Sequence, residues 1–138
     1  MLSKKAQYAI YALVRLAKEK NKDGMRIIEI AEAENIPRKF LETILLDLKN
    51  NGFLISKQGK NGGYFLRKQP DNINLADVIR VFDGAIALLP CAAQKYFQPC
   101  SYNKDETKCG VSLAFKKIRD ETVKLMENTT IADIINLE

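Results

Sequence analysis

The 138-residue chain contains no histidine, and this absence narrows the chemistry that it could perform. Histidine is the usual base partner of a serine or cysteine nucleophile, and no nucleophile in this sequence has another evident partner. The glycines form no nucleotide-binding pattern either. Gly59, Gly62 and Gly63 stand too close together for a phosphate loop, and no helix is predicted directly after them. We therefore expect a protein that is not an enzyme.

The sequence also lacks a long apolar run and is poor in cysteine. The longest stretch without a polar residue, 85–93, contains a proline and is far shorter than the ~20 residues that a membrane-spanning helix needs. Near the N-terminus, Arg15 interrupts the apolar residues and no small-residue cleavage site follows. Three cysteines, an odd number, argue against a secreted disulfide framework. We expect a cytoplasmic protein that makes no membrane contact.

Charge is distributed unevenly along the chain. Residues 1–70 contain 14 Lys+Arg and 7 Asp+Glu, a net charge of +7, whereas residues 71–138 contain 8 and 10, a net charge of −2; together they give the +5 of the whole chain. A basic patch attracts nucleic acid because binding releases counterions from the phosphates. A lysine-rich solvated surface would give the same composition, so charge alone does not decide between the two interpretations.

The pattern from residue 27 to residue 68 predicts a winged helix-turn-helix. Apolar residues at three- and four-residue spacing predict helices over 4–20, 27–34 and 37–51, with turns at 21–24 and at 35–36. Pro37 suits the first position of the third helix, and Gly52 suits the position just after it. Strands are predicted at 54–58 and 64–68, around a glycine-containing loop. We expect a mainly α fold with a small β-hairpin, in which residues 1–70 form a DNA-binding domain.

Residues 71–138 are predicted to contain a connecting helix at 74–83, a cysteine loop at 85–110, a long helix at 111–127 and a short closing helix. Asn74 suits the N-cap of the connecting helix, and Thr130 with Asp133 suits the start of the closing helix. The long helix carries an apolar side, formed by Leu113, Ile118, Thr122, Leu125 and Met126. This side could fold back onto its own domain, but we favour a dimerisation helix, because symmetric dimers are common and read palindromic operators.

The helix predicted over 37–51 is the recognition helix of this winged fold, and it carries polar residues opposite its apolar face. In a winged helix the start of this helix enters the major groove, where Arg or Lys donates to guanine, Glu accepts from cytosine, and Thr offers a hydroxyl or a methyl group. The wing suits phosphate or minor-groove contacts. The candidate DNA-binding residues are Arg38, Lys39, Glu42 and Thr43 on the helix and Lys57, Gln58, Lys60 and Asn61 on the wing. They could instead be solvated surface or contact another protein, since helix-turn-helix geometry also serves protein contacts.

Several segments together resemble a known family. The order LSKKAQYAIYAL, IIEIAEAENIP, FLETILLDLKNNGFLISKQGKNGGYFL, INLADVIRVFDG, a cysteine loop and a terminal TTIADI is similar to the bacterial Rrf-type transcription factors, the IscR, NsrR and CymR type. The resemblance covers nearly the whole chain, and its most specific parts are the start of the recognition helix and the GKNGGY wing. It implies a homodimeric winged-helix repressor of double-stranded DNA, in which Glu42 reads bases. Gln58 stands where many members have an arginine in the wing. Pro37 stands where the N-cap residue is commonly serine or threonine.

The resemblance also gives the cysteines a role. Cys91, Cys100 and Cys109 are separated by eight residues each time, and in cluster-binding members the cysteines of this loop hold an iron–sulfur cluster. The resemblance therefore implies a 2Fe-2S or 4Fe-4S cluster whose state alters operator affinity. Ser112 stands where the IscR type has a histidine ligand, so the fourth ligand is unknown, with Asp105 and Glu106 as candidates. A zinc site and thiol oxidation without metal are alternatives.

Overall fold

The computed structural model describes residues 1–19 and 24–138. The predicted turn at 21–24 falls almost entirely outside these residues, as does the last residue of the helix predicted over 4–20. Along the chain the elements are α1 (Lys4–Lys18), α2 (Ile27–Glu34), α3 (Arg38–Asn50), β1 (Leu54–Lys57), β2 (Gly63–Leu66), the 3-10 turn η1 (Pro70–Asn72), α4 (Leu75–Asp83), the 3-10 turn η2 (Pro90–Ala92), α5 (Gly110–Glu127) and α6 (Ile131–Leu137).

The α2–turn–α3 unit forms because the turn residues satisfy the end of α2 and anchor the start of α3. Asn35 adopts the left-handed conformation (φ 53°), which asparagine tolerates better than most residues. Ile36 is buried, and its N–H donates to the Ala31 carbonyl at 2.9 Å. Pro37 is the N-cap residue of α3, so our assignment of Pro37 to the first helical position is off by one residue. Its carbonyl accepts the first helical hydrogen bond, from the N–H of Leu41 at 2.9 Å.

The wing is an antiparallel β1–β2 hairpin that gains a third segment from the residues before α2. Leu54 pairs with Leu66 and Lys57 pairs with Gly63. Met25 bridges to Tyr64 through two backbone hydrogen bonds of 3.0 and 2.7 Å. This close approach requires glycine at position 24, where φ is +69° and an added Cβ would lie 2.5 Å from the Tyr64 carbonyl oxygen. The bridge fixes the hairpin to the start of α2.

One hydrophobic core joins both halves of the sequence. Leu13, Ile30 and Ile44 lie in it fully buried, with contributions from α1, α2 and α3. Ile73, just before α4, and Ile131, the first residue of α6, belong to the same cluster and are also fully buried. The Ile131 N–H donates to the Ile73 carbonyl at 2.9 Å, so these two segments are held by backbone pairing as well as by packing. Helices α4 and α6 therefore both pack against α1.

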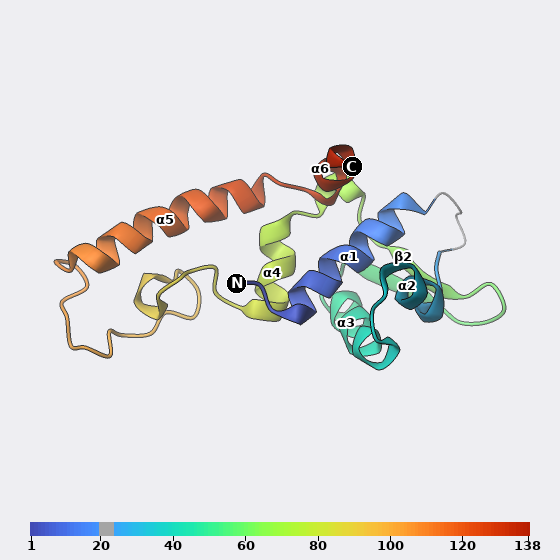
Figure 1. Ribbon diagram of the computed structural model, residues 1–138, viewed down its shortest axis with the longest axis horizontal. Helices are drawn as coiled ribbons and strands as arrows, with labels where there is room; N and C mark the ends of the chain where they lie inside the picture. Colours follow the sequence, from blue (N-terminus) through green and yellow to red (C-terminus); the bar gives the residue numbers. More distant parts are fainter. Residues whose placement is uncertain (20–23) are drawn as a thin grey trace.

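Helix α5 extends away from this core, and residues 85–109 run beside it (Figure 1). Of its 18 residues, Ser112 and Val123 are the ones buried within a single chain. Within the chain it packs against α4 and η2. The described helices include none that is both long enough and apolar enough to cross a membrane.

Candidate functional site

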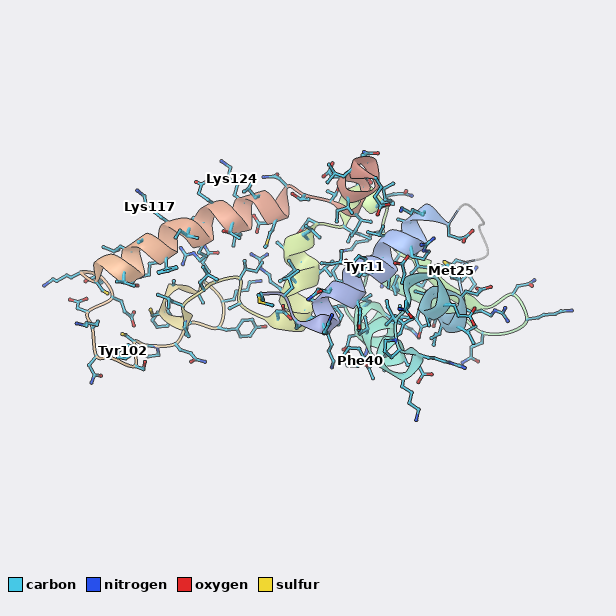
Figure 2. The ribbon with its side chains drawn as sticks, in the orientation of Figure 1. Tyr11, Met25, Phe40, Tyr102, Lys117 and Lys124 are labelled. Atoms are coloured by element: carbon cyan, nitrogen blue, oxygen red, sulfur yellow. The ribbon has the colours of Figure 1, made fainter. Side chains whose placement is uncertain are left out.

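Helix α3 separates an apolar face from a polar one. Leu41, Ile44, Leu45 and Leu48 are fully buried. The polar residues predicted for DNA contact lie on the exposed side, before Leu41 and between Leu41 and Ile44: Arg38, Lys39, Glu42 and Thr43. The start of the helix is held in place by Phe40, whose ring meets Tyr8 of α1 edge to face at 5.7 Å between centroids. Figure 2 shows Phe40 on the edge of the molecule that α3 forms, away from α5.

The polar groups of α3 are only weakly engaged within the chain. The Nε atom of Arg38 lies 3.6 Å from the Glu42 Oε1 atom, and both side chains are about half exposed, so water screens the pair and little free energy holds it together. Thr43 donates its hydroxyl hydrogen to the Phe40 carbonyl at 2.9 Å, which leaves its methyl group and oxygen lone pairs available. Arg38 and Glu42 can therefore exchange partners at small cost.

The wing carries the other predicted residues at the end of β1 and in the loop that follows it. Lys57, Gln58, Lys60 and Asn61 are all exposed. The Lys57 ammonium lies 5.1 Å from the centre of the Phe65 ring, which orients it along the hairpin. Strand β1 packs against α3, so the base of the wing is attached directly to this helix.

Two further cations near α3 were not among the predicted residues. Lys5 holds its ammonium 6.0 Å from the ring of Phe40, and Lys4 holds its ammonium 5.8 Å from the ring of Tyr8. Both come from the first turn of α1, and the Tyr8–Phe40 contact brings that turn to the start of α3. The sequence signal was a basic pair at a helix start, but only the packing of α1 on α3 shows where it points.

The three cysteines lie around one cavity of about 300 Å³ between the loop and the start of α5. Cys91, Cys100 and Cys109 are half-buried and form no disulfide. Among the described residues, no three His, Cys, Asp or Glu side chains are arranged to hold a metal ion. The three cysteines therefore line one cavity without the arrangement that a single zinc ion requires.

The cavity also separates the two acidic residues considered as further ligands. Glu106 lines it, whereas Asp105 does not. Asp105 instead accepts hydrogen bonds from the hydroxyl and the backbone N–H of Thr107. Both bonds lower the pKa of the Asp105 carboxyl, and the bond from the hydroxyl has the larger effect. Ser112 is 2% exposed and lines the same cavity, and its Oγ has no hydrogen-bond partner among the described residues. Thiols, a carboxylate and a buried hydroxyl fit an iron–sulfur group.

Separate polar contacts join the cysteine loop to α5, α5 to α4, and α4 to α1. The Nη1 atom of Arg119, on α5, donates to the Ala92 carbonyl at 2.6 Å. Arg80, on α4, donates to Glu127 at the other end of α5 at 3.2 Å. Asp83, at the end of α4, accepts from the backbone N–H of Ser3 at 3.0 Å and from the Ser3 hydroxyl, and Ser3 is the N-cap of α1. Helix α1 in turn packs on α3.

A helix-turn-helix with an attached hairpin and an exposed, polar recognition helix defines the winged helix-turn-helix class of regulators. Residues 2–137 match the sequence model of the Rrf2 family, described as an iron-dependent transcriptional regulator. The chain belongs to this family, as the sequence motifs predicted, and its members are transcriptional regulators and not enzymes. The predicted mainly helical winged fold with a β-hairpin is confirmed.

Individual relatives agree with this assignment. An rrf2-like protein of Rhodobacter capsulatus, named as an HTH-type transcriptional regulator, is 36% identical over 98% of this chain and 92% of its own length. The regulator CymR of Bacillus subtilis is 29% identical over 96% of this chain and 88% of its own. The solved structure of B. subtilis CymR, titled the global cysteine regulator, superposes with a TM-score of 0.80 over 100% of this chain and 98% of that one, at 26% identity. The structure of T. potens IscR shares the fold, with a TM-score of 0.74 at 23% identity over 99% and 86% of the two chains.

Proposed function

We propose that this chain is a homodimeric repressor that binds a palindromic operator, and that a cluster in its cysteine loop controls its affinity for DNA. The observation that carries the proposal is the exposed polar face of α3, held next to a basic wing. Arg38, Glu42 and Thr43 read bases, Lys39 beside them neutralises a phosphate, and Lys57, Gln58, Lys60 and Asn61 contact the phosphates or the minor groove. Glu42 supports base reading, because a carboxylate is repelled by phosphates and gains only from a base-edge donor.

The dimer is supported by the apolar surface that α5 leaves exposed. Ile118 and Leu125 are 47% and 68% exposed in the single chain. An open cavity of about 570 Å³, with mostly apolar walls, lies between α5, α4 and the N-terminal residues, and Ile118, Thr122 and Met126 line it. Leu113, also on the predicted apolar side, is 46% exposed. A second copy of α5 would cover this surface, and residues 71–138 would then act as the dimerisation and sensing part while residues 1–70 bind DNA.

The cluster is supported by the cavity that the three cysteines share. Cys91, Cys100 and Cys109 would hold it through their thiolates. Such a cluster supplies iron whose oxidation state and ligands respond to oxygen, nitric oxide or iron supply. The chain's own part is to exclude bulk water from the half-buried thiols and to connect the loop to α1. The contacts of Arg119, Arg80 and Asp83 form the route by which a rearranged loop would shift α1 and the α3 that packs on it.

The DNA-binding part is tested by titrating the purified protein onto genomic fragments at several salt concentrations. We expect salt-dependent binding that Lys39→Ala and Glu42→Ala weaken at selected fragments. Absence of binding to any fragment would refute the repressor and favour a protein that acts through protein–protein contacts. The direction of regulation is measured by transcription in vitro from a promoter that contains a selected fragment, where added protein should reduce the transcript.

A further inference from the structure

Glu106 is the one acidic residue among those lining the cysteine cavity. Its side chain is half-buried, whereas Asp105 beside it is exposed. The Oε1 atom of Glu106 accepts a hydrogen bond from the backbone N–H of Cys100 at 2.9 Å. This bond fixes the carboxylate beside the backbone of Cys100, one of the three cysteines. Asp105 is instead occupied by Thr107 and lies 3.9 Å from the Lys108 ammonium.

Ser112 contributes a second polar group to the same cavity from the first turn of α5. Its side chain is almost completely buried, and its hydroxyl has no partner among the described residues. Buried hydroxyl groups are nearly always hydrogen-bonded, because leaving one unpaired is costly. The carboxylate and the hydroxyl thus line the cavity that the cysteines share, the carboxylate from the loop and the hydroxyl from α5.

We propose that Glu106 is the fourth ligand of the cluster and that Ser112 donates a hydrogen bond to one of its sulfur atoms. This inference rests on the proposed cluster-binding function. An ionised carboxylate is an anionic oxygen donor, whereas a serine hydroxyl must first lose a proton that it holds tightly. Glu106 is therefore the ligand and Ser112 the donor. All four ligands come from one chain, so the site is complete in each subunit and needs no histidine. A single oxygen ligand beside three thiolates is the position at which an incoming small molecule exchanges most easily.

The experiment is anaerobic reconstitution of the full chain with ferrous iron and sulfide, followed by measurement of iron, sulfide and the visible spectrum. Wild type and Asp105→Asn should bind equal iron and have the same spectrum. Glu106→Gln should have a changed spectrum and lose iron to a chelator at least about tenfold faster, since even outer-shell substitutions cost 10–100-fold in affinity. The glutamine oxygen still accepts from the Cys100 N–H, so this variant keeps the loop folded, and circular dichroism verifies that.

Ser112→Ala has a separate readout. It should retain wild-type iron but have a lower reduction potential, because a hydrogen bond to sulfur stabilises the more negative, reduced form. Identical spectra and chelator rates for Glu106→Gln and Asp105→Asn would overturn the ligand assignment, and an unchanged potential for Ser112→Ala would overturn the donor assignment. Wild-type protein that takes up no iron would overturn both.

Binding of the same samples to genomic DNA separates this inference from the proposed function. If wild type binds DNA and holds iron while Glu106→Gln behaves as Asp105→Asn does, only the ligand assignment fails. If wild type binds DNA but takes up no iron, the repressor stands and its cluster control fails. If wild type holds iron but binds no DNA, the proposed repressor function is refuted. The assignments of Glu106 and Ser112 are then still decided by the spectra, the chelator rates and the reduction potential.

Discussion

Lys39 offers a sharp test of the DNA-binding surface. It is exposed near the start of α3 and makes no hydrogen bond or ion pair with the described part of the chain, so its replacement by alanine removes one cation and disturbs no internal contact. Each lysine that neutralises a phosphate contributes about 0.9 to the slope of log K against log salt concentration. A dimer carries two copies of Lys39, so Lys39→Ala should make this slope shallower by about 1.8. The ratio of wild-type affinity to Lys39→Ala affinity should therefore be about tenfold smaller at 200 mM salt than at 50 mM salt.

The assay is fluorescence anisotropy with a labelled operator fragment over a series of salt concentrations. Lys117→Ala is the matched control, because it removes the same charge from α5, where Lys117 projects outward with Lys124 (Figure 2). The control should keep the wild-type slope. Equal slopes for both variants would refute the placement of DNA against α3. A change near 0.9 for Lys39→Ala would indicate one DNA-bound copy and contradict the dimer.

Three further predictions use other parts of the chain. Glu42→Ala should reduce discrimination between operator and unrelated DNA by about 1–3 kcal/mol while strengthening binding to unrelated DNA, as measured by competition titrations. Ile118→Glu should shift sedimentation toward the monomer, whereas Lys117→Glu should not; equal behaviour would contradict the α5 interface. Hydrogen bonds from the backbone N–H and the hydroxyl of Thr130 lower the pKa of Asp133 below its ordinary 3.8, and the bond from the N–H has the larger effect. The stability that these bonds supply is present above pH ~4 and is lost as the pH falls through the lowered pKa. In urea unfolding, Asp133→Asn should therefore be less stable than wild type at neutral pH and as stable as wild type in strong acid.

The local signals in the sequence were reliable because the interactions behind them span only a few residues. Asn74 caps α4 through the Asp77 N–H at 2.9 Å, and Thr130 and Asp133 form a capping box at α6, both as predicted. Gly52 follows α3 with φ +82°. The strands are shorter than predicted, since Gln58 lies past the last paired residue of β1. That the eight candidate residues contact DNA stays a prediction.

The candidate cavity could be predicted only in part. The sequence identified the three cysteines as one site through the family resemblance, and the structure places them around one cavity. It left Asp105 and Glu106 equivalent, because neighbouring residues in a loop without periodicity have no predictable direction. The sequence identified Ser112 only as the residue that stands where the IscR type has a histidine ligand. Nothing local shows that the start of α5 turns this hydroxyl inward.

The sequence by itself determined the helices, the hairpin, the basic N-terminal half and membership of the Rrf2 family, because periodicity, caps and motifs are properties of short segments. The tertiary structure alone decided that Met25 pairs with Tyr64, that Ile73 and Ile131 join the core of α1 to α3, and that Glu106 and Ser112 line the same cavity as the cysteines. These contacts join residues far apart in the chain or choose between neighbours in a loop. Their outcome depends on which faces pack together, and that is fixed by the free energy of the whole fold.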